Sequence, residues 1–272
     1  MKMSVNKKIY ITLRIAIGMC FLGHGAFGII TKAIWCNYFA VFGIDRASAY
    51  QLMPWVGTVD IALGLCMLVY PVRFIPVWLV MWGFLTAALR PLSGEPFPEL
   101  IERAGNFGAP LILILVTGGA ARKNMLAKIS PPLSQGSHAE GRIVAILQFI
   151  AFLILAGHGW LNLLGKKSLL DQYIALGFAD PQRTSIVLGI IEILAAFSVF
   201  VLPSKKLIGA IVLWKIVSEL FYPHHELFEW IERGGSYGCL ISLWIATNPI
   251  RGRSWKENLF NVWSATRILK TN

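Results

Sequence analysis

The octapeptide Ile-Glu-Arg-Ala-Gly-Asn-Phe-Gly at residues 101–108 returns as Ile-Glu-Arg-Gly-Gly-Ser-Tyr-Gly at residues 231–238. Matches at a nearly constant offset continue outward from this pair toward both ends of the chain. They pair His24-Gly25 with His158-Gly159, Gly57-x-x-Asp60 with Gly189-x-x-Glu192, Pro71 with Pro203, Trp82 with Trp214, and Pro91 with Pro223. Residues 20–115 therefore resemble residues 154–245, and the chain is a tandem repeat.

The composition identifies the environment in which these repeats fold. Of the 272 residues, 56% are hydrophobic and only 14% are charged, against about 25% charged in an average soluble domain. A soluble protein of this length could not bury so much apolar surface, which excludes an ordinary cytosolic domain, a coiled coil, collagen and a disordered chain. The composition is typical of a polytopic membrane protein.

Each repeat contains four apolar runs, and their lengths together with the need to satisfy the backbone internally favour helices over strands. We expect eight transmembrane helices, at residues 9–30, 53–70, 73–90, 104–120, 142–164, 184–202, 206–222 and 235–248. Because four is an even number, both repeats enter the membrane in the same orientation. The predicted fold is an all-α integral membrane protein of two parallel tandem four-helix bundles, with a pseudo-two-fold axis along the membrane normal.

The predicted domains follow from this repeat. Residues 1–120 form the first four-helix unit, and residues 142–250 form the second. The polar stretch 121–141 reads as a cytoplasmic linker, and the basic segment 251–272 as an amphipathic cytoplasmic tail at the membrane surface.

The distribution of basic residues predicts the orientation. Placing the N-terminus on one side puts sixteen Lys and Arg residues on that side and eight on the other, whereas nine of the fourteen acidic residues lie in the connections of the second side. The positive-inside rule then places both termini in the cytoplasm of a cell, with the chain integral to the inner (plasma) membrane. The net charge of +11 is explained by contact with membrane lipid, and no nucleic-acid partner is expected.

Ionisable residues inside these spans point to a functional site, because charges at membrane depth usually face a bundle interior or a cavity. His24 and Asp60 come to similar depth on neighbouring helices, and His158 and Glu192 repeat the arrangement. The pairs Glu102-Arg103 and Glu232-Arg233 stand where the fourth helix of each repeat begins. We therefore expect one polar cluster per repeat, composed of a His, a carboxylate and a Glu-Arg pair above them.

Three interpretations of these clusters remain open. The first is structural, a hydrogen bond between His and carboxylate that locks neighbouring helices together. The second is a proton-handling or ligand site. The third is metal or haem ligation, in which His24 and His158 bind one haem across the pseudo-two-fold axis.

The second repeat has further polar residues without a counterpart in the first. Lys215 and Glu219 lie four residues apart on one helix face, and the adjacent His224 and His225 are weak candidates for metal ligands.

The opening motif of each repeat resembles DoxX-like (DoxX/DoxD) membrane proteins. The residues that carry the resemblance are Arg14, His24-Gly25 and Lys32, followed by Asp60-x-x-x-Gly64 in a Gly-rich second helix. The resemblance covers each half once and implies two fused four-helix units. It also implies a quinone-linked oxidoreductase or a subunit of one. The second repeat departs from the pattern, since Arg14 has no equivalent there and Lys32 has only the nearby Lys166.

The leading functional prediction is a protein that binds a small hydrophobic or redox ligand, quinone-like, in the outer half of the bundle. Quinone is preferred over haem as the cofactor, and a periplasmic or membrane redox partner is expected. The proposed catalytic residues are Glu192, His158, Glu232 and Arg233. Glu192 accepts or relays a proton, His158 forms a hydrogen bond to a carbonyl oxygen, and Arg233 stabilises developing negative charge. Further ligand-binding candidates are His24, Asp60, Glu102, Arg103, Lys215 and Glu219.

Three other functions fit the same pattern. One is a transporter. Another is a membrane-embedded isomerase or cyclase, in which a buried carboxylic acid, Asp60 or Glu192, protonates an alkene of a lipid substrate. The last is a non-catalytic partner subunit.

Overall fold

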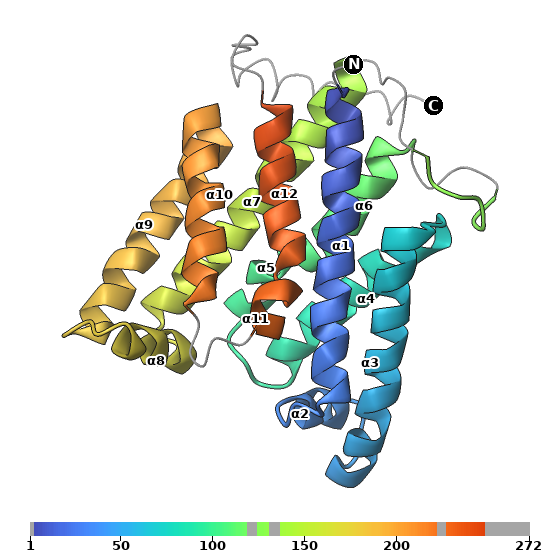
Figure 1. Cartoon of the computed structure of the whole chain (residues 1–272). Helices are drawn as coiled ribbons and strands as arrows, with labels where there is room; N and C mark the ends of the chain where they lie inside the picture. Colours follow the sequence, from blue (N-terminus) through green and yellow to red (C-terminus); the bar gives the residue numbers. More distant parts are fainter. Residues whose placement is uncertain (1–2, 119–123, 131–136, 222–226, 248–272) are drawn as a thin grey trace, which may run out of the picture.

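The computed structural model describes residues 3–118, 124–130, 137–221 and 227–247, and the regular elements in this part of the chain are helices (Figure 1). Their bounds are α1 Val5–Ile29, α2 Trp35–Ala40, α3 Arg46–Val69, α4 Phe74–Leu92, α5 Pro98–Glu102, α6 Ala104–Val116, α7 Ser137–Leu163, α8 Lys167–Ala175, α9 Pro181–Val201, α10 Lys205–Leu220, α11 Leu227–Glu232 and α12 Gly234–Ala246. The expected all-α fold is confirmed for these residues.

Five helices are long and apolar enough to cross a membrane by length and composition: α1, α3, α4, α7 and α9. Two further apolar helices, α6 and α12, are shorter, with 13 residues each. The helix α10 has 16 residues and contains the charged pair Lys215 and Glu219. All eight predicted spans therefore correspond to a helix, and five of them meet the criteria for a span.

Local sequence explains where several of these helices begin. The side chain of Ser4 accepts a hydrogen bond from the backbone of α1, and Asp45 does the same at the start of α3. Asp180, followed by Pro181 at the first helical position, begins α9, and Ser204 begins α10. These are preferred N-cap residues because their oxygens satisfy backbone N–H groups that lack a partner inside the helix.

Four short helices were not expected from the sequence. Helices α2 and α8 follow α1 and α7, and both lie across the same end of the bundle (Figure 1). Helices α5 and α11 come directly before α6 and α12, which begin at Ala104 and Gly234. The residues Arg103 and Arg233 stand between the two helices in each case.

The packing partners of these elements differ from the expectation of one bundle per repeat. Helix α1 packs on α3 and α7 packs on α9, as expected for neighbours. However, α11 and α12 of the second repeat pack against α1, and α5 of the first repeat packs against α7. The short helices α5 and α11 are therefore exchanged onto the first helix of the other repeat, whereas α6 packs on α4 of its own repeat and contacts both α1 and α7.

Three glycines show how closely the exchanged segments approach. A Cβ at Gly23 would lie 2.7 Å from the Cα of Glu232, and a Cβ at Gly157 would lie 2.7 Å from the Cα of Glu102. Where α6 and α12 meet, a Cβ at Gly105 would lie 2.5 Å from the Cα of Ser236. The repeated octapeptide therefore supplies the contact between the two repeats, which explains its glycines.

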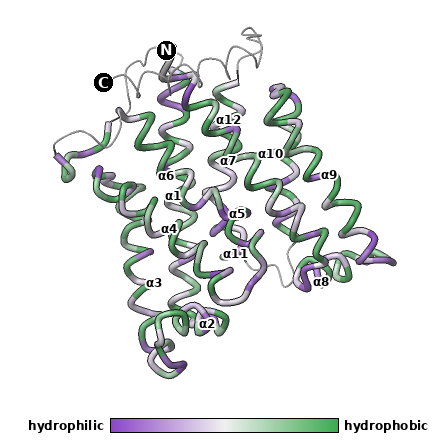
Figure 2. Tube along the Cα trace, turned by 180° about the vertical axis from the view of Figure 1, so that it is seen from behind, coloured by the Kyte–Doolittle hydropathy of each residue, from purple (hydrophilic) through white to green (hydrophobic). Residues whose placement is uncertain are grey.

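The apolar core and the apolar exterior are both extensive. Leu13, Leu113, Leu147 and Leu243 come from four different helices and are fully buried in one cluster. On the outside, the hydrophobic residues run along most of α9, and hydrophilic residues gather at the helix ends and around α5 (Figure 2). An apolar outer surface of this kind is expected for helices that face lipid.

Candidate functional site

The first polar cluster joins α1, α3 and α4. His24 Nδ1 lies 2.7 Å from Asp60 Oδ2, and Trp82 Nε1 donates to Asp60 Oδ1 at 2.9 Å. Asp60 is only 1% exposed, so both of its oxygens are satisfied inside the protein. The predicted pairing of His24 with Asp60 is confirmed, whereas the part played by Trp82 was missed.

The second cluster repeats this geometry on α7, α9 and α10. His158 Nδ1 lies 2.5 Å from Glu192 Oε2, and Trp214 Nε1 donates to Glu192 Oε1 at 3.2 Å. Asn162 adds a donor to the same Oε2 at 3.2 Å and accepts a hydrogen bond from Tyr173. The recurrence of Trp at matching positions was the sequence signal for this third partner.

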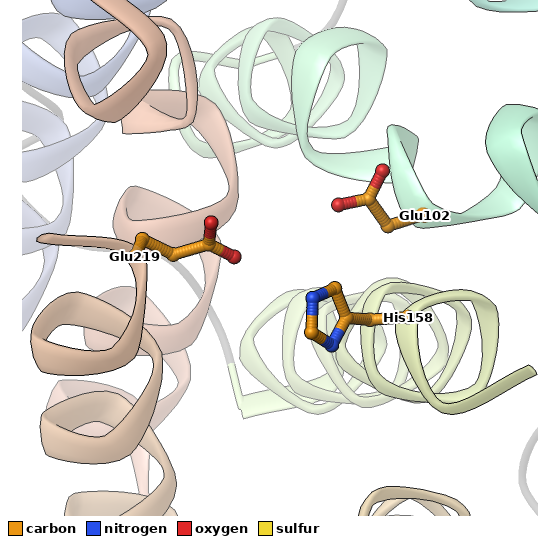
Figure 3. Close-up of side chains that lie close together, drawn as sticks. All are labelled: Glu102, His158 and Glu219. Carbon is orange, nitrogen blue, oxygen red and sulfur yellow. The ribbon is translucent and has the colours of Figure 1, made fainter. Parts of the chain in front are cut away.

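The glutamates of the two Glu-Arg pairs lie in the opposite half from the one expected, whereas the arginines stay with their own repeats: Arg103 lines a cavity with His24, and Arg233 contacts Glu219. Glu102 of α5 points toward His158 of α7 and Glu219 of α10 (Figure 3), with ligand-type atoms of the three residues within 4.8 Å of one another. Glu232 lines a cavity with His24 and Arg103. The expectation that each repeat supplies its own pair is therefore wrong, because α5 and α11 are exchanged between the repeats.

Three cationic groups, Arg103, Arg233 and Lys215, hold the acids Glu102 and Glu219 of the second cluster. Arg103 Nη1 lies 2.8 Å from Glu102 Oε2, and Arg233 bonds Glu102 Oε1. Arg233 Nε also lies 2.9 Å from Glu219 Oε2, and Lys215 Nζ lies 2.8 Å from Glu219 Oε1. Arg233 thus connects an acid of the first repeat to an acid of the second.

Two further ion pairs cross between the repeats in the same exchanged manner. Lys166 Nζ lies 2.5 Å from Glu99 Oε1, and Lys32 pairs with Glu229. Lys166 is therefore the true counterpart of Lys32, which the sequence comparison had treated as only a nearby match. These pairs anchor the exchanged helices α5 and α11 at their first turns.

The missing counterpart of Arg14 is also found. Arg14 Nε donates to the backbone oxygen of Met67 at 2.9 Å, near the end of α3. Gln148 Nε2 donates to the backbone oxygen of Val199 at 3.2 Å, near the end of α9. A glutamine therefore satisfies the last turn of α9 as the arginine satisfies that of α3.

The contacts favour an ion-pair network over a metal centre at Glu102, His158 and Glu219. Such a donor set would suit a transition metal. However, each oxygen of Glu102 and Glu219 already accepts a bond from a guanidinium or ammonium group. A divalent cation would have to displace these groups and would be repelled by them. The other metal candidates, His224 and His225, lie outside the described residues.

The charges of the two clusters assign a role to the histidines. Among the described residues, eight carboxyl groups gather here with six Lys and Arg side chains: Asp60, Glu95, Glu99, Glu102, Glu192, Glu219, Glu229 and Glu232 with Lys32, Arg90, Arg103, Lys166, Lys215 and Arg233. The carboxyl groups outnumber the Lys and Arg side chains by two. His24 and His158 each place Nδ1 against one of the carboxyl groups, so each histidine serves as a hydrogen-bond partner of a buried acid.

A cavity of about 540 Å³ opens beside the second cluster. His158, Glu192 and Glu219 line its polar end, and Leu188 and Val217 are among its apolar walls. Its volume falls within the usual 300–1,000 Å³ of small-molecule sites, which combine apolar walls with a few polar groups.

The corresponding cavity of the first half is much smaller, at about 120 Å³. Trp35 packs on the ring of His24 with centroids 4.7 Å apart, and Leu89 is buried there. The polar groups around it include Arg90, Arg103 and Glu232. The two repeats have thus diverged, and the larger cavity belongs to the second.

The predicted site residues therefore divide into two groups. The large cavity is lined by His158, Glu192 and Glu219, with Glu102, Arg233 and Lys215 in contact with that set. The small cavity is lined by His24, Arg103 and Glu232, with Asp60 bonded to His24.

No protein-family model, curated protein or solved structure matches the chain.

Proposed function

We propose that the chain is a fused pair of DoxX-like repeats that binds a small hydrophobic, quinone-like ligand in the large cavity of its second half. The observation that carries this proposal is the cavity of about 540 Å³, which joins a buried His–carboxylate pair to apolar walls. In this proposal the eight helices span the membrane as two units related by a pseudo-two-fold axis, with the short helices α5 and α11 exchanged between them.

The polar end of the cavity suits a ring that carries carbonyl oxygens. A quinone carbonyl accepts hydrogen bonds, and the Nε2 of a protonated His158 would donate one at this end, while His158 Nδ1, Asn162 and Trp214 hold Glu192 in place. The rest of the lining is mainly apolar, which suits a ring system and a short hydrocarbon substituent. A freely water-soluble, highly charged ligand would fit these walls poorly, because its charges would lose hydration without partners.

The chemistry supported at this end is proton transfer. Reduction of a quinone to a quinol takes up two electrons and two protons. His158 would deliver one proton to the carbonyl oxygen beside it, and Glu192 would pass a replacement proton from water to His158. The second carbonyl oxygen would take its proton from water at the Asp180–Arg183 end of the cavity, and a redox partner would supply both electrons. Arg233, held between Glu102 and Glu219, would stabilise negative charge on the ligand. Glu232 is assigned to the small cavity instead.

We also propose that both termini face the cytoplasm of the inner membrane. Helix α1 begins and α12 ends at the same end of the bundle (Figure 1). The large cavity lies toward the opposite end, beside α8 and the start of α9. With the more basic side inside, this places the cavity in the outer half of the membrane.

Calorimetric titration of the purified chain with a short-chain ubiquinone analogue tests the proposal. Leu188→Trp fills the large cavity, and Val56→Trp makes the same change at the matching position of the small cavity. We expect Leu188→Trp to weaken binding about tenfold or more, equivalent to ~1.4 kcal/mol, and Val56→Trp to leave it unchanged. Equal effects of the two variants, or no binding by the wild type, would contradict the proposal. A Soret band in the visible spectrum would indicate haem instead.

A further inference from the structure

The rim of the large cavity is apolar and exposed on one side. Four side chains line the cavity and also reach the outer surface: Val187 is 48% exposed, Trp214 44%, Val217 39% and Phe221 45%. We call these four residues the lateral opening. Each of the four lines the cavity and is at least 39% exposed, so this side of the cavity, between α9 and α10, borders the molecular exterior.

The surface around the lateral opening is the kind that faces lipid. On α9, Ile190 and Leu194 are 48% and 61% exposed, and on α10, Leu213 and Leu220 are 65% and 46% exposed. Helix α9 packs mainly against α7 and makes few contacts with α10. The lateral opening therefore lies between two helices that are apolar on their outer faces and are only loosely joined to each other.

The cavity has a second, polar boundary at the end of the bundle. Asp180 and Arg183 line it at the start of α9, and Glu192 lies further along the same helix. The rise of 1.5 Å per residue places Glu192 roughly 18 Å from Asp180. The cavity is elongated, has polar groups at both ends and borders the apolar lateral opening. This shape suits a molecule whose polar headgroup enters the protein and whose hydrocarbon tail remains outside.

We propose that the ligand reaches the large cavity from the bilayer through the lateral opening, and that it carries a hydrocarbon tail which remains between α9 and α10. This inference rests on the proposed function, because the headgroup is assigned to the site beside His158 and Glu192. It adds the class of ligand, a tailed molecule of the lipid phase, and its route. Trp214 connects the two parts of this route, because its side chain is exposed at the lateral opening and its Nε1 donates a hydrogen bond to Glu192 at the polar end.

Access of lipid chains to the cavity can be measured without knowing the ligand. Leu188 lines the cavity but is only partly exposed, and Val56 occupies the matching position in the small cavity. Each is changed to Cys in the full chain and labelled with the fluorophore bimane. The background carries Cys66→Ser, because Cys66 is exposed and the other three cysteines are buried. The proteins are placed in vesicles of phosphatidylcholine brominated on its acyl chain and in unbrominated vesicles.

The expected result is a loss of about half of the bimane fluorescence at Leu188→Cys in brominated vesicles, because bromine quenches on contact and chains enter an open site. Val56→Cys should keep its fluorescence. Addition of a long-tailed ubiquinone analogue should relieve the quenching at Leu188→Cys by displacing the lipid chains. Absence of quenching there, or equal quenching at both positions, would overturn the lateral opening. Quenching that persists after addition of the long-tailed quinone would support the lateral opening but contradict the assignment of a quinone headgroup to the cavity.

Discussion

At the scale of single residues, the two clusters share one arrangement of histidine, carboxylate and tryptophan, and they differ in the residues around it. Both place a histidine Nδ1 against a carboxylate whose other oxygen accepts from a tryptophan. Only the second cluster adds an asparagine donor and the buried pair of Lys215 and Glu219. These additions lie at the larger cavity, which is the one that we propose to hold the ligand.

We predict that Glu192→Gln weakens binding of a short-chain quinone about 10-fold to 100-fold. The amide keeps the shape of the side chain but removes the carboxylate that orients the ring of His158 at 2.5 Å, and a hydrogen bond to a charged group contributes ~1.5–3 kcal/mol. Calorimetric titration measures the change. The matching variant Asp60→Asn lies in the small cavity and should perturb binding far less, so a larger effect there would reassign the site to the first half.

At the scale of helices, small residues decide which segments can meet. Gly157 faces the backbone of Glu102, and Gly23 faces the backbone of Glu232. In each case the approaching segment belongs to the other repeat. The missing side chain at each glycine is what lets the backbone of α5 or α11 lie directly against α7 or α1.

We predict that Gly157→Ala destabilises the chain by ~1–3 kcal/mol, the usual cost of overpacking a close contact. The added methyl group would meet the backbone of α5, which cannot move aside as a flexible side chain could. Thermal unfolding in detergent, followed by intrinsic fluorescence, gives the direction of the change.

Gly141→Ala provides the matched control for that substitution. Gly141 lies on the same helix α7, but a Cβ there would meet nothing within 4 Å. Alanine favours a helix by up to ~1 kcal/mol over glycine, so this variant should unfold at the same or a higher temperature. Equal destabilisation by both variants would show that the loss at Gly157 does not come from contact with α5.

The helices themselves could largely be predicted from the sequence, and the short segments could not. Apolar runs long enough to span a bilayer fix the bounds of α1, α4 and α9 to within four residues. Helix α3 begins seven residues, and α7 five residues, before the predicted spans. The helices α5 and α11 have only 5 and 6 residues, too few for a hydrophobic period to be recognised. Yet these two segments carry Glu102 and Glu232, on which the composition of each cluster depends.

At the scale of the whole molecule, the exchange of segments was invisible to the sequence for a physical reason. The tandem repeat in the sequence shows that α5 and α11 occupy equivalent positions in the two repeats. The same repeat pattern is expected whether each of these helices packs on its own repeat or on the other one. Only contacts between the repeats distinguish these arrangements, such as Arg233 with Glu102 and Lys166 with Glu99. The exchange makes both sites composite, and neither half of the chain contains a complete cluster.

This arrangement leads to a prediction that separates the exchanged fold from two independent bundles. Glu102 belongs to the first repeat but contacts Arg233 and lies beside His158 of the second. Glu102→Gln should therefore weaken quinone binding in the large cavity, by about tenfold, because it leaves the buried guanidinium of Arg233 without one of its two acidic partners. Glu232→Gln, the equivalent change in the second repeat, should leave that binding nearly intact, since Glu232 faces His24. Titration of both variants with the same quinone decides the matter. The opposite order of effects would mean that each repeat completes its own site, and the exchange of α5 and α11 would then have no part in forming the ligand site.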